Sequence, residues 1–198
     1  EYRSGELFKM MNEKYNFGIT KDEIETIINY IYPKNIEVNP TEKYKYQIIS
    51  NNNGIDVDRF DYLMRDIQMT GLNYGIEYER IMHHSKIEEG EIIYSEKVKT
   101  NIEEFFRIRF IMYKEVYNHR TVRGIEFMMK DFIRFFNELY SISNIIQNDD
   151  WIKFNQLNDS IIYLHNFHTN LNEKECKMKE IIHNIMARNI YKSIGEII

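Results

Sequence analysis

The chain has 198 residues, 43% hydrophobic and 29% charged, and its net charge of −5 argues against a general nucleic-acid binder, which needs a basic excess. Two prolines and eight glycines are too few for a β-sandwich or barrel, and a single cysteine excludes an internal disulfide framework and indicates a reducing compartment. No apolar run reaches the roughly 18 residues of a membrane span, so we expect a mostly helical intracellular protein, in the cytoplasm or nucleus.

The first half of the chain is predicted to form helices separated by turns. Thr20 and Glu23 match a capping box, and isoleucines then recur at helical spacing until Pro33 ends the helix. The sequence NNNG at residues 51–54 is a turn signal. We expect the next helix over about residues 56–70.

The second half is expected to be helical after one irregular stretch. Between residues 71 and 100, Gly90 beside an alternating apolar run predicts a short β-hairpin or an irregular insert. Helical patterns then follow over residues 102–146, 150–166 and 173–191. The fold class is therefore all-α, a compact helical body with a smaller C-terminal helical lobe.

Residues 128–136 carry a stripe of aromatic and thioether side chains. Met128, Phe132 and Phe136 recur at helical spacing, with Met129 and Phe135 beside them. We interpret this stripe as packing in the core or between subunits.

The helix expected over residues 56–70 presents an unusual polar face. At about 100° per residue, Asp58, Tyr62 and Asp66 share one side of it, with Arg59 at the edge. The opposite face is apolar and is made by Phe60, Leu63, Met64 and Ile67. Periodicity alone leaves two interpretations open, an ordinary solvated face or a ligand-binding face.

The residues of this helix also carry a long motif. Residues 56–66 follow the pattern D-x-D-R-x-D-Y-x-x-R-D, with seven fixed positions in eleven. The pattern resembles the signature of the HD-domain deoxynucleoside triphosphate triphosphohydrolases (dNTPases). TGLNYG at residues 70–75 is similar to its continuation in bacterial members, whereas NGIDVD at residues 53–58 is closer to the animal SAM-and-HD-domain members.

Other segments share the resemblance more weakly. RFIMYKEVYNHR at residues 109–120 resembles the family's second substrate segment, and RNIYKSIGE at residues 188–196 is similar to a C-terminal stretch of the animal members. The resemblance implies an HD-domain-like helical bundle. Residues 1–147 would be the C-terminal part of the HD phosphohydrolase domain, and residues 148–198 a helical lobe.

The resemblance also implies roles for individual residues. Asp58 would be the last protein ligand of a divalent metal ion, such as Mg, Mn, Fe or Zn. Glu1 joins the predicted catalytic set because residues 1–4 resemble the segment that follows the family's catalytic histidine. Arg59 and Arg109 would bind phosphate oxygens of a dNTP substrate through their guanidinium forks.

Further roles are implied for the sugar and for a regulator. Tyr62 would donate to a phosphate oxygen and Asp66 would accept from the sugar 3′-hydroxyl. Tyr117 would pack against C2′ and exclude ribonucleotides, and Asn118 stands where animal members carry a glutamine, one methylene longer. The C-terminal basic residues are assigned to a regulatory nucleotide: Arg188 and Lys192.

The implied reaction is attack of a metal-bound hydroxide on the α-phosphorus, which releases a deoxynucleoside and intact triphosphate. A complete family site has an upstream histidine, a His-Asp doublet and a catalytic histidine before Glu1, but this sequence has no His-Asp dipeptide. We therefore expect a fragment of the catalytic domain that is inactive alone. Two alternatives stay open, an HD phosphohydrolase acting on nucleoside monophosphates or signalling nucleotides, and a non-catalytic nucleotide-binding or interaction protein. A homo-oligomer is implied by the resemblance.

Overall fold

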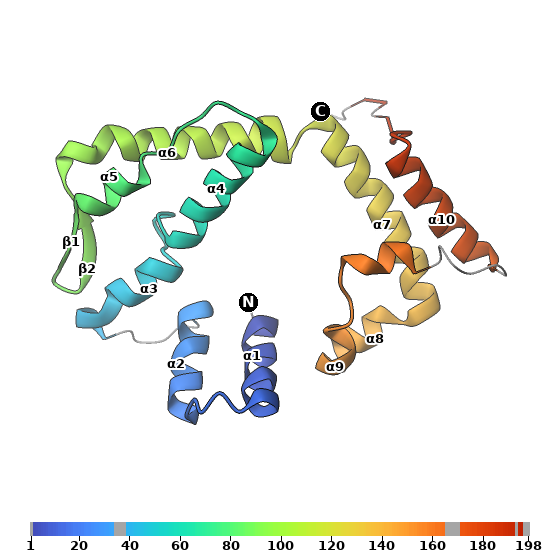
Figure 1. The fold of residues 1–198 in the computed structure, drawn as a ribbon, viewed down its shortest axis with the longest axis horizontal. Helices are drawn as coiled ribbons and strands as arrows, with labels where there is room; N and C mark the ends of the chain where they lie inside the picture. Colours follow the sequence, from blue (N-terminus) through green and yellow to red (C-terminus); the bar gives the residue numbers. More distant parts are fainter. Residues whose placement is uncertain (1, 34–38, 165–170, 193, 196–198) are drawn as a thin grey trace. The chain divides into compact units, whose positions relative to one another are not determined.

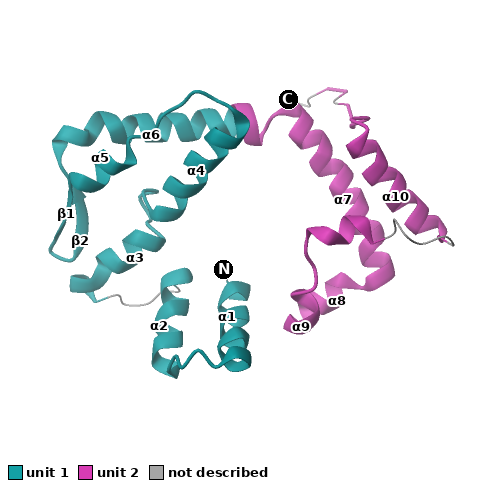
Figure 2. Cartoon of the chain, viewed as in Figure 1, with its two compact units in different colours: residues 1–114 teal, residues 115–198 magenta. Residues whose placement is uncertain are grey.

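The computed structural model describes residues 2–33, 39–164, 171–192 and 194–195, and these are mostly helical (Figure 1). Two compact units divide the chain, residues 1–114 and 115–198 (Figure 2). The all-α prediction is confirmed, because a two-stranded antiparallel hairpin is the whole sheet content of the described residues. Within them, no helix is both long and apolar enough to cross a membrane.

The first unit contains the helices α1 Tyr2–Tyr15, α2 Lys21–Ile31, α3 Lys43–Ile49, α4 Val57–Thr70, α5 Tyr78–His83 and α6 Lys99–Ile111, with 3₁₀ turns at Pro40–Glu42 and Glu96–Val98. Strands β1 Ser85–Glu88 and β2 Glu91–Tyr94 lie between α5 and α6. A π-helical turn over Met112–Tyr117 follows α6. The second unit contains α7 Arg120–Tyr140, α8 Ile142–Gln147, α9 Trp151–Phe154, a 3₁₀ turn at Asp159–Tyr163 and α10 Glu173–Met186.

The predicted capping box is present at the start of α2. The backbone N–H of Glu23 donates to the Thr20 hydroxyl at 3.3 Å, and the Thr20 N–H donates to the Glu23 carboxylate at 2.9 Å. The Thr20 N–H and the Thr20 hydroxyl, which donates to the same carboxylate at 2.8 Å, lower the pKa of Glu23. The helix ends at Ile31, two residues before Pro33, as expected because proline cannot continue a helix.

Residues 85–94 form the hairpin that the sequence predicted as one of two possibilities. Glu89 and Gly90 have φ values of 50° and 79°, and this pair of positive values is what a two-residue hairpin turn needs. The turn sits against the start of α3, where the N–H of Tyr44 donates to the Gly90 carbonyl at 2.7 Å. Gln47 of α3 also accepts from the N–H of Ile92 at 2.7 Å, so α3 covers β2.

The apolar face of α4 forms the core of the first unit. Leu63 and Ile67 are buried, and Phe60 and Met64 are half-buried. The other buried apolar residues of this unit come from the turn before α4, from α5 and from the segment around α6: Ile55, Ile81, Val98, Phe105, Ile108 and Met112. Packing against α6 therefore leaves the face with Asp58 directed away from the core.

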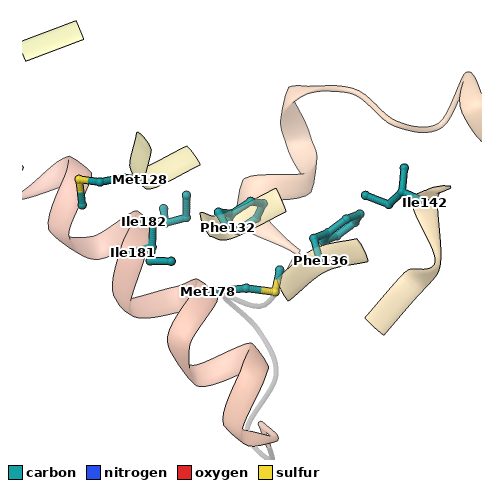
Figure 3. Close-up of a cluster of buried hydrophobic side chains, with 7 residues drawn as sticks. All are labelled: Met128, Phe132, Phe136, Ile142, Met178, Ile181 and Ile182. Carbon is teal, nitrogen blue, oxygen red and sulfur yellow. The ribbon is translucent and has the colours of Figure 1, made fainter. Parts of the chain in front are cut away.

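The core of the second unit lies between α7 and α10, which run side by side (Figure 1). The predicted stripe supplies Met128, Phe132 and Phe136, whose side chains are 1–3% exposed. Figure 3 shows them facing the α10 side chains and the first residue of α8: Met178, Ile181, Ile182 and Ile142. The interpretation of this stripe as a packing surface is confirmed.

The helix predicted over residues 150–166 was wrong in the part that the structure describes. A helix over Trp151–Phe154 is followed by a 3₁₀ turn over Asp159–Tyr163. The Asn158 side chain accepts from the N–H of Ser160 at 2.9 Å, so it competes with the helical backbone pattern and starts a separate turn. The domain boundary between residues 147 and 148 lies inside the second unit and stays a prediction.

The segment after α10 packs on α7 at a glycine. An ideal Cβ atom at Gly124 would lie 2.7 Å from Cγ2 of Ile190 and 2.8 Å from the backbone carbonyl oxygen of Tyr191. Two turns further along α7, Asp131 accepts from the Tyr191 hydroxyl at 3.1 Å. Gly124 thus makes the space in which this segment, flanked by Arg188 and Lys192, lies on the helix.

Phe132→Ala tests the core of the second unit. The side chain is 1% exposed, and its ring centroid lies 6.0 Å from that of Phe136. We expect the free energy of unfolding to fall by about 3–5 kcal/mol, measured by urea unfolding followed by circular dichroism. Ile133→Ala, at a position 40% exposed on the same helix, is the control and should cost less than ~1.5 kcal/mol. Equal costs for the two variants would contradict this core.

Gly124→Ala tests the packing of the C-terminal segment. A Cβ atom that close to the Tyr191 carbonyl forces the segment off α7, while alanine itself favours the helix. We expect faster tryptic cleavage after Arg188 with little loss of helix content. Gly75→Ala, where a Cβ atom meets nothing within 4 Å, should leave the cleavage rate unchanged. An unchanged rate in Gly124→Ala would show that this packing does not hold the segment.

Candidate functional site

The polar face predicted for residues 56–66 lies on α4. Asp58, Tyr62 and Asp66 follow one another at four-residue spacing within this one helix, so they share a face. Asp58 is exposed, and Tyr62 and Asp66 are half-buried. The structure therefore contains the shared face that the sequence predicted. The roles assigned to the three side chains stay predictions.

A tight turn over residues 51–56 precedes this face. Gly54 has a φ of +85°, and its N–H donates to the carbonyl of Asn51 at 3.0 Å. Within the turn, Asn51 Nδ2 donates to the Ile55 carbonyl at 3.0 Å, and the Ile55 N–H donates to the Asn53 side chain at 2.9 Å. These hydrogen bonds fix the backbone before α4.

Asp56 is the N-cap of α4 and is only 4% exposed. Its Oδ1 accepts from the backbone N–H of Arg59 at 2.9 Å, and its Oδ2 accepts from the backbone N–H of Asn51 at 3.2 Å. Oδ2 also forms an ion pair with Nη1 of Arg59. The carboxylate therefore joins the turn, the first turn of the helix and a candidate phosphate-binding side chain.

Both candidate phosphate-binding arginines lie against this turn. Nη1 of Arg59 donates to the Asn51 carbonyl at 3.4 Å, in addition to its ion pair with Asp56. Nη1 of Arg109, which comes from α6, lies 3.3 Å from the position that a Cβ atom at Gly54 would take. Two guanidinium groups that are 50 residues apart in sequence are thus brought to one loop.

The remaining predicted site residues do not belong to α4 or to the turn before it. Tyr117 ends the π-helical turn and is half-buried, and Asn118 is exposed; both belong to the second unit. Arg188 and Lys192, also in the second unit, follow α10 and are exposed. Glu1 lies outside the described residues.

The cavities that border α4 lie on a different side of the helix. One of about 450 Å³ and one of about 410 Å³ share the lining residues Val57, Phe60 and Met82. Neither is lined by Asp58, Tyr62 or Asp66.

The described residues do not by themselves fit a divalent metal ion. Among them, no three His, Cys, Asp or Glu side chains lie close enough to hold one. Asp58 offers a single exposed carboxylate, which is too few ligands for a protein site of this kind.

Two residues that organise the site, Asn51 and Asp56, were predicted only as part of a turn and as a motif position, without a role in the site. They are the buried polar side chains of the described chain, at 6% and 4% exposure. The signal was available, since an aspartate directly before an amphipathic helix is a typical N-cap.

Comparison with known proteins places these features in a family. Residues 76–196 match the profile of the HD associated region, which is more than half of the chain. The chain is 35% identical over 179 residues to the deoxynucleoside triphosphate triphosphohydrolase SAMHD1 homolog of Dictyostelium discoideum, covering 89% of this chain and 34% of that protein.

Two further relatives extend the match. A putative HD domain-containing protein of Acanthamoeba polyphaga mimivirus is 35% identical over 81% of this chain and 38% of its own length. The human deoxynucleoside triphosphate triphosphohydrolase SAMHD1 is 28% identical over 78% of this chain and 26% of its own length. The chain therefore spans about a quarter to two fifths of the curated relatives that it matches. Together, the profile match and these relatives show that the chain belongs to the SAMHD1-like family of HD-domain proteins that carry the HD associated region.

Proposed function

We propose that this chain supplies the nucleotide-binding face of an HD-domain hydrolase that cleaves a dNTP into a deoxynucleoside and triphosphate. The observation that carries the proposal is the convergence of Arg59 and Arg109 on the turn before α4. Several relatives are named as deoxynucleoside triphosphate triphosphohydrolases, which supports the same function.

The charges at the turn favour a polyphosphate ligand. Arg59 is paired with the buried Asp56 carboxylate, and Arg109 brings a second guanidinium group to the same turn. Guanidinium forks bind phosphate oxygens through paired, charge-assisted hydrogen bonds. A monophosphate needs fewer cations than this, which makes the triphosphate the better fit. Tyr62 would donate to a phosphate oxygen beside them.

The family resemblance also assigns contacts with the sugar. Asp66 lies two helical turns from Asp58 on the same face and would accept from the 3′-hydroxyl of a deoxyribose. Tyr117 would pack against C2′, and Asn118 would contact the ligand beside it. These assignments rest on the family resemblance of their segments.

Asp58 would provide one oxygen ligand to a divalent metal ion, which supplies Lewis acidity to this class of hydrolase. Since the sequence contains no His-Asp dipeptide, we expect this chain alone to bind nucleotide without turning it over.

The proposal also includes a regulatory nucleotide, an oligomeric state and a location. Arg188 and Lys192 would contact a regulatory nucleotide. A homo-oligomer is implied by the family resemblance. The single cysteine supports a location inside the cell, in the cytoplasm or nucleus.

Arg109→Gln tests the phosphate contact. Losing a charge-assisted hydrogen bond should weaken dATP binding to the 198-residue chain about tenfold or more, measured by isothermal titration calorimetry. Arg107→Gln is the matched control, because Nε of Arg107 donates to Glu104 at 2.6 Å on the exposed side of α6. Its affinity should stay within about twofold of the wild type. Failure of the wild-type chain to bind dATP, or equal losses in both variants, would refute the proposal.

Tyr117→Ala tests the choice of sugar. If the ring occupies the space of a 2′-hydroxyl, its removal should bring the affinity for ATP close to that for dATP, while the wild type prefers dATP. Tyr113→Ala, at a position 62% exposed one turn earlier, should keep the wild-type preference. Parallel titrations with the two nucleotides give the ratio, and an unchanged ratio in Tyr117→Ala would count against this role.

A further inference from the structure

Asp56 is placed where it can control how Arg59 meets a ligand. It is the buried carboxylate of the described chain, and burial of an unpaired charge is costly. Its partners are two backbone N–H groups and Nη1 of Arg59. The pKa of Tyr94, from β2, is raised by burial and by the nearby Asp56 carboxylate. A strong driving force therefore keeps the guanidinium group on the carboxylate.

This arrangement uses Nη1 of the guanidinium group of Arg59, whose side chain is half-buried. Nη1 carries two N–H donors, and these meet the Asp56 carboxylate and the Asn51 carbonyl. The Nε and Nη2 donors form the parallel edge of the fork, the one suited to two oxygens of a phosphate. No other contact of Arg59 occupies this edge within the described residues.

We propose that Asp56 is a positioning residue, which holds Arg59 by Nη1 so that the Nε–Nη2 edge of the fork is presented to the triphosphate. The inference rests on the proposed function and deepens it by naming the group that orients one of its two arginines. A free arginine samples many rotamers, and holding it before binding removes part of the ordering cost of the complex. Asp56 itself need not touch the ligand.

A variant that keeps the helix cap separates positioning from simple folding. Serine is a good N-cap, so Asp56→Ser retains an acceptor for the backbone N–H of Arg59 but removes the partner of its guanidinium group. Asp56→Asn is the second variant, which keeps the side-chain shape and loses the charge. Circular dichroism establishes that each chain is folded before binding is measured.

The experiment is a double-mutant cycle on binding of inorganic tripolyphosphate, in EDTA, to the 198-residue chain. Asp56→Ser should weaken binding about three- to tenfold in the wild type and less than about twofold in an Arg59→Gln background. Asp56→Asn should show the same coupling. A merely structural role would lower the affinity equally in both backgrounds.

The chain offers a matched control at α9. Asp150 is the N-cap there, it accepts from the backbone N–H of Lys153 at 3.1 Å, and it pairs with the Lys153 ammonium group at 3.0 Å. The same cap-and-cation arrangement is thus present on a helix of the second unit that carries none of the candidate site residues. Asp150→Ser should leave tripolyphosphate affinity unchanged.

The outcomes separate this inference from the proposed function. If wild type fails to bind, or Arg59→Gln binds as tightly as wild type, the phosphate role of Arg59 is wrong and the inference falls with it. If Arg59→Gln weakens binding but Asp56→Ser acts equally in both backgrounds, the proposed function stands and the positioning role is overturned. Tighter binding by Asp56→Ser would show that the carboxylate competes with phosphate, which also overturns it.

Discussion

The candidate site depends on one buried carboxylate. Asp56 accepts hydrogen bonds from the backbone on both sides of it, at Asn51 and at Arg59, and pairs with the Arg59 side chain. The first contact closes the turn, and the second fixes the residue at which α4 begins. Residues at four-residue spacing share a face wherever a helix begins, but the cap fixes where that face lies relative to the turn. The position of the polar face of α4 is therefore set by the turn that precedes it.

Packing on the opposite side of α4 brings the second arginine to the same place. The ring centroid of Phe60 on α4 lies 4.9 Å from that of the buried Phe105 on α6, and Arg109 lies one turn further along α6. Gly54 completes the arrangement, because a larger residue there would crowd the Arg109 guanidinium group. Core packing and turn geometry are thus both needed for two cations to meet, and neither alone would suffice.

Local sequence signals predicted much of this fold. The capping box at Thr20, the helix after the NNNG turn and the buried α7 stripe each follow from spacing rules that act over a few residues. The helix predicted over 150–166 failed because Asn158 caps a separate turn, and apolar spacing does not register that competition. The role of Gly124 depends on a segment more than 60 residues away, which no local pattern contains.

The candidate site also combines features that local patterns predict with features that depend on distant segments. The shared face of Asp58, Tyr62 and Asp66 could be read from periodicity, and the motif gave it a chemical meaning. The place of Arg109 beside Gly54 could not be predicted from periodicity, because it depends on how α6 packs on α4.

The most direct test of the account is a crystal structure of the chain bound to a dNTP. The account predicts phosphate oxygens within hydrogen-bonding distance of both Arg59 and Arg109, with the nucleotide lying along the α4 face. A nucleotide bound elsewhere, with neither arginine in contact with its phosphates, would contradict the central claim.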